Sequence, residues 1–366
     1  MTDKDFSGVY DLEAYDYILP ESQIAQTPAE PRDSSRLMVW STEKDRVEHR
    51  CFRDITDYLQ PGDLLVLNDT RVLPARLWGR KAASGGRVEI LLLSPSDHGF
   101  DRWRALVRPG RRLPAGTEVL VGERVLVIEE VLEDGLRLVR VGTDKEDVLS
   151  FLESHGQMPL PPYIRSMDAS RVREAYQTVF ASNDGSVAAP TASLHFTKEL
   201  LERIESKGVR LARVTLHVGL GTFRPVKASD IREHRIHSEY CEILEAAGEA
   251  IRECRKRGGR VVAAGTTVAR TLESMATTDG CVEPGTKNTE LFIYPGFRYR
   301  VVDALITNFH LPKSSLLMLV AAFAECLGGK NREEQDALKS LHRVYALAVA
   351  EGYRFFSFGD AMFVQK

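Results

Sequence analysis

Thr-Leu-His-Val-Gly-Leu-Gly-Thr-Phe occupies residues 215–223 and follows an apolar, β-rich run that begins at Val209. The run predicts a strand, and His217, Gly219 and Gly221 come where that strand ends. Glycine lets a backbone approach a ligand closely, and a histidine exchanges protons near neutral pH. The spacing lacks the third glycine of the dinucleotide-binding fingerprint. The stretch therefore predicts either another kind of ligand site or a simple glycine-rich turn with one hydrogen-bonded histidine.

From residue 155 onward, strand-like and helix-like runs alternate around this stretch. Such alternation is typical of an α/β body that is barrel-like or has a mainly parallel sheet. Ligands bind at the carboxyl ends of the strands in open sheets of this class. Several loops that follow predicted strands carry small or polar residues, so we expect them to gather at one edge as a ligand pocket.

The loops supply two sets of candidate residues. The acid/base candidates are His195, His217, His237, Glu239 and His310. The candidates for holding the ligand are Thr191, Gly219, Gly221, Gly265, Thr266, Thr267 and Asp360.

Three chemistries use residues of these types. His234-x-x-His237-x-Glu239 offers metal ligands, but it lacks the helical H-E-x-x-H register and partnered cysteines, so no metal is expected. A serine hydrolase is disfavoured because the chain has no Gly-x-Ser-x-Gly elbow. General acid/base chemistry on a nucleotide-like ligand is the third reading. The residues alone do not identify that ligand.

Residues 61–150 have a different texture, with short β-type runs broken by glycine turns. Several strands at this spacing predict a small barrel or sandwich. Because helical patterning resumes afterwards, we predict an all-β domain over 61–150, inserted into an α/β domain formed by 1–60 and 151–366.

The predicted insert is locally basic, although the whole chain has a net charge of −3. Between residues 71 and 112 ten Lys or Arg face three acids, an excess of seven positive charges, with Trp78 and Trp103 interleaved. Arginines neutralise phosphates and aromatic rings stack on unpaired bases. A solvated face of alternating strands explains the pattern equally well. The candidate nucleic-acid contacts are Arg36, Arg71, Arg76, Arg108 and Arg111.

The cysteines, the start of the sequence and the length of the apolar runs indicate in which cellular compartment the protein works. The five cysteines are scattered rather than paired, as expected in a reducing cytoplasm. The polar start of the sequence has no signal-peptide pattern. The longest apolar run, residues 316–324, is far shorter than the ~20 residues that a membrane helix needs. We therefore expect a cytoplasmic protein without a membrane partner.

Motifs along the full chain resemble one family, the S-adenosylmethionine:tRNA ribosyltransferase-isomerases of queuosine biosynthesis. The motifs are Tyr17-Ile-Leu-Pro-Glu, Pro31-Arg-Asp-Ser-Ser-Arg-Leu, Leu67-Asn-Asp-Thr-Arg-Val-Leu-Pro-Ala-Arg-Leu, Met158-Pro-Leu-Pro-Pro-Tyr-Ile, Val187-Ala-Ala-Pro-Thr-Ala-Ser-Leu-His-Phe, the stretch 215–223, His237-Ser-Glu, Ile293-Tyr-Pro-Gly-Phe, Thr307-Asn-Phe-His-Leu-Pro and Arg354-Phe-Phe-Ser-Phe-Gly-Asp-Ala-Met-Phe. One departure is Ser193, where the family commonly has glycine.

The resemblance implies a cytoplasmic, monomeric enzyme that uses S-adenosylmethionine as a ribosyl donor and needs no metal. Its other substrate would be tRNA with 7-aminomethyl-7-deazaguanine at the wobble position. The ribosyl moiety would be transferred and isomerised to give epoxyqueuosine-tRNA, with release of adenine and methionine. The alternatives are a non-catalytic tRNA-binding protein of the same fold and an S-adenosylmethionine-dependent tRNA methyltransferase.

Overall fold

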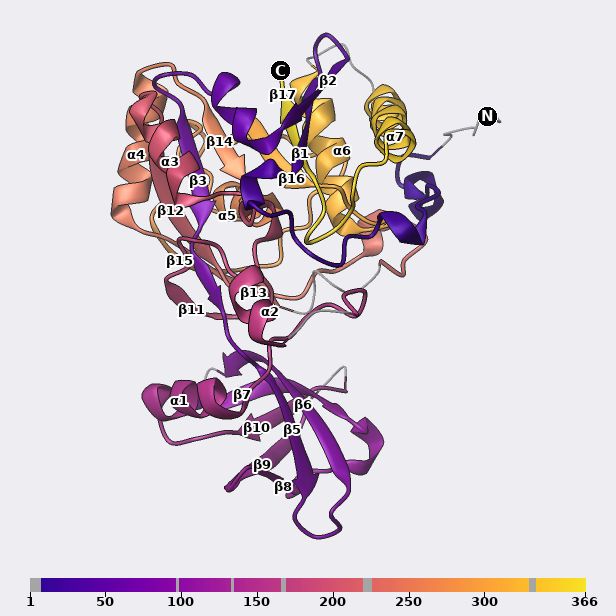
Figure 1. Ribbon diagram of the computed structural model, residues 1–366, viewed down its shortest axis with the longest axis vertical. Helices are drawn as coiled ribbons and strands as arrows, with labels where there is room; N and C mark the ends of the chain where they lie inside the picture. Colours follow the sequence, from indigo (N-terminus) through magenta and orange to yellow (C-terminus); the bar gives the residue numbers. More distant parts are fainter. Residues whose placement is uncertain (1–7, 97–98, 133–134, 166–168, 220–225, 329–333) are drawn as a thin grey trace.

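In the computed structural model of the protein, an α/β body and a smaller β-barrel lie one above the other (Figure 1). The residues described are 8–96, 99–132, 135–165, 169–219, 226–328 and 334–366.

The body is built on one nine-stranded sheet. In spatial order its strands are β15 (Gly285–Thr289), β13 (Glu239–Ile243), β12 (Arg210–Leu216), β3 (Leu64–Asn68), β14 (Val261–Ala264), β16 (Ala304–Asn308), β17 (Ala361–Gln365), β1 (Arg36–Ser41) and β2 (Arg46–Cys51). The central strands β12, β3, β14 and β16 are parallel, as are β1 and β17, and the other neighbours are antiparallel. The body is thus an open mixed sheet with a parallel centre.

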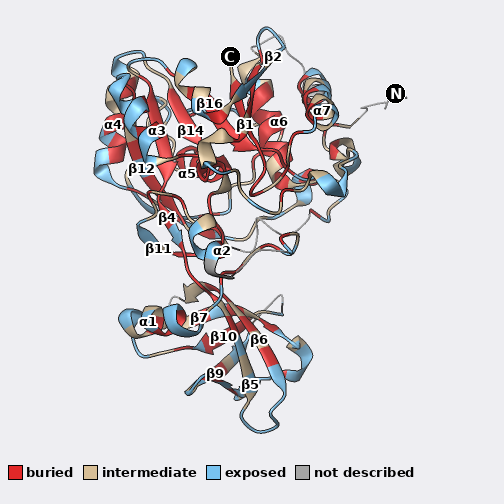
Figure 2. Cartoon of the chain, in the orientation of Figure 1, coloured by how far each residue is buried: buried red, intermediate tan, exposed pale blue. Residues whose placement is uncertain are grey.

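Helices cover both faces of this sheet. They are α3 (Lys198–Ser206), α4 (Glu245–Lys256), α5 (Thr266–Ser274), α6 (Ser315–Leu327) and α7 (Glu334–Ala350). Side chains alternate along β3, so that Leu64 and Val66 pack in the core with α4, α5, α6 and α7, whereas Leu65 and Leu67 pack in the core with α3. Strands buried on both faces are expected at the centre of a parallel sheet, and Figure 2 shows this continuous burial.

The barrel closes through six strands. They are β5 (Arg76–Lys81), β6 (Arg87–Ser96), β7 (Gly99–Arg108), β8 (Glu118–Val121), β9 (Arg124–Val131) and β10 (Arg137–Arg140). The chain then forms α1 (Lys145–His155) and α2 (Ala169–Ala175), and returns to the body through β11 (Asn183–Ser186), which pairs with β4 (Thr70–Val72). An α/β body with an inserted β-barrel is therefore confirmed as the fold class.

Two sequence expectations are corrected by this topology. Leu64–Asn68, predicted within the all-β insert, lies at the centre of the large sheet, and only residues 76–140 form barrel strands. The aromatic run at residues 353–358 by itself predicts the last strand, but Phe356 has φ +73° and the strand is Ala361–Gln365. The domain boundaries at 61 and 150 stay a prediction.

No helix in the described part of the chain is long and apolar enough to span a bilayer.

Candidate active site

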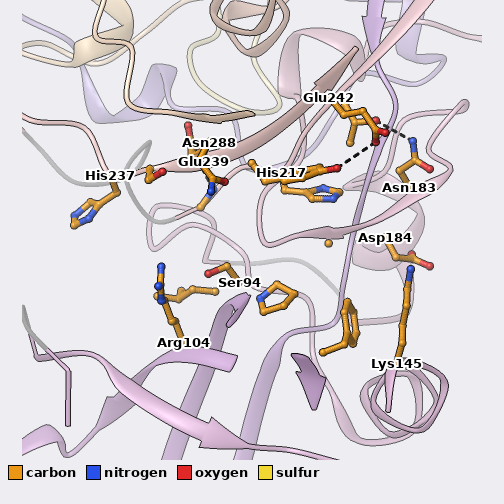
Figure 3. Close-up of a pocket in the computed structure, with 18 of the residues that line it drawn as sticks. Ser94, Arg104, Lys145, Asn183, Asp184, His217, His237, Glu239, Glu242 and Asn288 are labelled. Carbon is orange, nitrogen blue, oxygen red and sulfur yellow. Dashed lines mark hydrogen bonds between the residues drawn. The ribbon is translucent and has the colours of Figure 1, made fainter. Parts of the chain in front are cut away.

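A cavity of about 670 Å³ lies between the body and the barrel. Its body wall includes Asn183, Asp184, His217, Gly219, His237, Glu239, Tyr240, Glu242 and Asn288, and its barrel wall includes Ser94, Phe100, Arg104 and Lys145. In Figure 3 the labelled body residues lie along one side, and Arg104 and Lys145 project toward them from the other. Four sequence-predicted residues therefore meet here: His217, Gly219, His237 and Glu239.

His217 lies directly after β12 and is held from three sides. Its Nδ1 is 2.8 Å from Oγ1 of Thr70, and its ring stacks on Tyr240 with 5.4 Å between ring centroids and an interplanar angle of 18°. Gly185 packs over the Nε2 end of the ring face so tightly that a Cβ there would lie 2.6 Å from Nε2. Burial lowers the pKa of His217 to about 4, helped by the positive charge of Lys145 and opposed by Asp69. The ring is therefore neutral at physiological pH.

Glu239, the first residue of β13, is buried beside this histidine. Its carboxylate forms an ion pair with Arg270 of α5, whose side chain is also buried, and accepts a hydrogen bond of 2.9 Å from the backbone N–H of Gly219. Arg270 also donates through Nε to the carbonyl of Leu291 at 3.0 Å. A buried charge needs such partners because desolvation is costly. Glu239 thus fixes the position of the loop that begins after β12.

Asn68, the last residue of β3, and Asp69 after it hold the end of β12 in place through hydrogen bonds. Asn68 is fully buried, and its side chain both accepts from the N–H of Leu216 at 3.0 Å and donates to its carbonyl at 3.1 Å. Its Nδ2 also donates to Oγ1 of Thr267 at 3.2 Å. The next residue, Asp69, accepts from Oγ1 of Thr215 at 2.8 Å and from Nδ2 of Asn183 at 3.1 Å. Asn68 and Asp69 therefore connect β12 with β11, two of the strands that carry the cavity wall.

A second cavity of about 270 Å³ lies on the other side of the loop after β12. Val218 lines this second cavity, whereas His217 and Gly219 line the first one. The second cavity is lined mainly by apolar side chains and includes five sequence-predicted residues: Thr191, Gly265, Thr266, Thr267 and His310.

The polar groups of the second cavity come from two strand ends. Gly265 (φ +111°) turns the chain from β14 into α5, and no side chain caps the first turn of that helix. Free N–H groups at a helix N-terminus favour anionic or hydrogen-bond-accepting ligand atoms. Beyond β16, Nε2 of His310 is 2.7 Å from Oγ1 of Thr307, and burial lowers the pKa of His310 to about 3. Thr266 and Thr267, which were predicted to lie in a loop, are the first two residues of α5.

The remaining predicted residues lie elsewhere. His195 is buried, with Nδ1 2.8 Å from Oγ of Ser35 and Nε2 3.2 Å from Nδ2 of Asn308, and burial lowers its pKa to about 3. Asp360 lies at the start of β17, where it accepts hydrogen bonds from the backbone N–H groups of Arg36 (3.0 Å) and Arg354 (2.8 Å). Neither His195 nor Asp360 lines either of the two cavities. Gly221 lies outside the described residues.

The arginines predicted to contact nucleic acid fall into separate groups. Arg76 and Arg108 are neighbours on the barrel, because they approach Glu89 at 3.4 and 3.9 Å. Arg111 is exposed in a short 3₁₀ turn, Arg71 lies 3.7 Å from Asp184, and Arg36 lies in the body over the ring of Tyr353.

The two tryptophans expected in a nucleic-acid contact have different environments. Trp103 is fully buried in the barrel core, so the expectation that its ring stacks on a base was wrong. Trp78 is 37% exposed on the outer face of β5, under the guanidinium of Arg87 at 4.3 Å.

Several residues of the large cavity were not singled out from the sequence. Arg104, Lys145 and Asp184 are isolated in sequence from the histidine loops, whereas Tyr240 directly follows the predicted Glu239. The triplet Asn183-Asp184-Gly185 is a recognisable turn signal that could have drawn attention to one of them. Ser193 is buried and donates to the carbonyl of Ala264 at 3.1 Å, without a positive φ. Among the described residues no group of three or more His, Cys, Asp or Glu is arranged to bind a metal.

Comparisons with known proteins cover both the body and the barrel. Residues 12–364 match the family model described as queuosine biosynthesis protein. A curated relative from Moorella thermoacetica, named S-adenosylmethionine:tRNA ribosyltransferase-isomerase, is 50% identical over 355 residues, covering 96% of this chain and 99% of the relative. A relative of the same name from Pelotomaculum thermopropionicum is 52% identical over 357 residues, with the same coverage. The crystal structure of S-adenosylmethionine tRNA ribosyltransferase from Thermotoga maritima matches with a TM-score of 0.54 and 39% identity, covering 96% of this chain and 99% of that one.

Proposed function

The chain belongs to the S-adenosylmethionine:tRNA ribosyltransferase-isomerase family of queuosine biosynthesis, and we propose that its two cavities divide that reaction between them. The reaction moves the ribosyl moiety of S-adenosylmethionine to 7-aminomethyl-7-deazaguanine at the tRNA wobble position and releases adenine and methionine. The observation that supports the assignment is the neutral, positioned His217 in a cavity between a body wall and a basic barrel wall.

In this proposal His217 is the base that removes the acidic proton from the carbon next to the sulfonium. When Nδ1–H donates to Oγ1 of Thr70, Nε2 carries the lone pair, and no other hydrogen bond to this ring is found in the described part of the chain. A general base must be in its proton-accepting form at the working pH and within hydrogen-bond reach of the proton. Burial provides that form. Glu239 positions the loop around the substrate, and His237 is the second group that exchanges protons.

The second cavity is proposed to hold the adenine end of the donor. Apolar walls with a few convergent polar groups are typical of small-molecule sites. The uncapped N–H groups at the start of α5 and the lining residues Thr191 and Thr266 would supply hydrogen bonds to a flat, heteroatom-rich ring of this kind. In this proposal the adenine occupies the second cavity and the sulfonium lies beside His217, on the other side of the loop after β12. His310 would then face the adenine as a neutral hydrogen-bonding group, because burial lowers its pKa to about 3.

The barrel is proposed to bind the anticodon arm of the tRNA. Arg76, Arg108 and Arg111 supply positive charge to phosphates, and the exposed face of Trp78 offers a surface for an unpaired base. We further propose that the enzyme acts in the cytoplasm as a monomer.

The test is one incubation of the protein with S-adenosylmethionine and tRNA carrying the aminomethyl base, followed by chromatography for small molecules. Adenine and methionine together with a heavier wobble nucleoside are the expected result. His217→Gln should abolish adenine release and leave tRNA binding intact. S-adenosylhomocysteine as the product would identify a methyltransferase instead, and tight tRNA binding without turnover would identify a non-catalytic binding protein.

A further inference from the structure

The charged side chains that line the large cavity are separated by sign. On the body wall the acids are Asp184, Glu239 and Glu242, whereas the barrel side contributes the cations Arg104 and Lys145 and no acid among the lining residues described. Figure 3 shows both cations extending from the lower, barrel side toward the body residues. A cavity with walls of opposite charge orients a substrate that carries both charges.

The fold places each of the two cations separately. Arg104 lies on β7 opposite Ser94 of β6. Its neighbours Trp103 and Ala105 are buried in the barrel core. Because successive residues of a strand point to opposite faces, Arg104 projects outward from the barrel. Lys145 is the first residue of α1, which Asp144 caps through its side chain. Its Nζ lies 5.5 Å from the centre of the Phe100 ring, another residue of the cavity wall. The two cations therefore come from independent elements of the barrel side.

We infer that Arg104 and Lys145 form an anion-binding edge that holds a negatively charged oxygen group of the substrate across the cavity from His217. This inference rests on the proposed function, because that function determines which anions enter. Two substrate groups have the required chemistry: a backbone phosphate next to the wobble nucleotide and the carboxylate of the methionine portion of the donor. Both accept charge-assisted hydrogen bonds from lysine and arginine.

The experiment measures binding without turnover for Lys145→Gln and Arg104→Gln. Matched controls are Lys198→Gln, an exposed lysine that also begins a capped helix, and Arg140→Gln, an exposed barrel arginine that does not line the cavity. The probes are S-adenosylmethionine alone and an anticodon stem-loop RNA that carries the aminomethyl base. Thermal unfolding of each variant verifies that the surface substitutions leave the fold intact.

A loss of about tenfold in affinity for one probe, with the other within twofold, supports the anion-binding edge and identifies the source of the anion. If the phosphate is the source, the RNA probe weakens and its salt slope falls by about 0.7–0.9 for each lost contact. If the carboxylate is the source, only the donor weakens. Affinities within twofold of the control variants for both probes would overturn the inference. Because no turnover is needed, a wild-type protein that binds both probes but releases no adenine would refute the proposed function and leave this inference standing.

Discussion

Replacing Gly185 with alanine tests whether the position of His217 matters for the reaction. Gly185 belongs to β11 and lies over the Nε2 end of the His217 ring face. An added Cβ would be 2.6 Å from Nε2 and 2.8 Å from both neighbouring ring carbons. Ordinary contacts between such atoms are about 3.5–4 Å. The imidazole must therefore move by about 1 Å or β11 must shift by the same amount.

The size of the expected effect follows from that displacement. A misplacement of about 1 Å at a catalytic group costs on the order of a hundredfold in rate. Overpacking of this kind also destabilises a protein by about 1–3 kcal/mol, which is insufficient to unfold a domain of ordinary stability. We therefore expect Gly185→Ala to lower kcat for adenine release about a hundredfold, with only a modest change in Tm.

Gly285→Ala is the matched control. Gly285 has φ +142°, close to the +153° of Gly185, but nothing lies within 4 Å of an added Cβ. It reports the backbone strain of alanine at such a φ without the clash. If both variants lost the same activity, strain rather than the histidine would be responsible. A Gly185→Ala enzyme with kcat within threefold of wild type would refute the reasoning, since the cavity would then tolerate a displaced imidazole.

Three further predictions concern stability and RNA binding. His195, His217 and His310 have pKa values lowered by burial to about 3, 4 and 3, so between pH 6.5 and 5 the unfolded chain binds more protons than the native one. The free energy of unfolding, measured with urea, should therefore fall as pH falls, by about 1 kcal/mol per pH unit for each histidine. His310→Gln should reduce the slope of this dependence by the contribution of one histidine. Glu239→Ala should lower the free energy of unfolding by about 3–5 kcal/mol, because it leaves the Arg270 charge buried without its partner. Adding Arg270→Met should recover part of that loss in urea titrations. If the effects of the two substitutions simply added, the ion-pair argument would be contradicted. Arg108 is 83% exposed on the barrel, so Arg108→Gln should lower the salt slope of tRNA binding by about 0.7–0.9, while Arg203→Gln on α3 should leave it unchanged.

Hydrophobic periodicity predicted the central elements well. The run from Val209 predicted β12, and the position of His217 after it placed this residue at the cavity. Thr197 and the pattern after it predicted the start of α3, where the Thr197 side chain accepts a hydrogen bond from the Leu200 N–H. These signals are local, since each depends on residues a few positions apart.

The parts that the sequence did not predict depend on distant partners. β13 begins at Glu239, a charged residue that does not signal a buried strand, and this glutamate is buried through its ion pair with Arg270, 31 residues away. The candidates also divide between two cavities: those after β14 and β16 line the second cavity, and those after β12 and at the start of β13 line the first. Trp103 could have been assigned to the barrel core by parity with Ala105 and Val107, which alternate with exposed positions.

The double hydrogen bond between Asn68 and the backbone of Leu216 has a consequence for how this chain tolerates insertions and deletions. Side chains alternate with a period of two, so a slip of one residue in β12 would turn His217 toward the apolar cavity and Val218 toward the charged one. Asn68 engages both the N–H and the carbonyl of one particular residue, which specifies a single alignment of β12 against β3. Length changes should therefore be tolerated before β12, in the turn after α3, but not between Leu216 and Gly219.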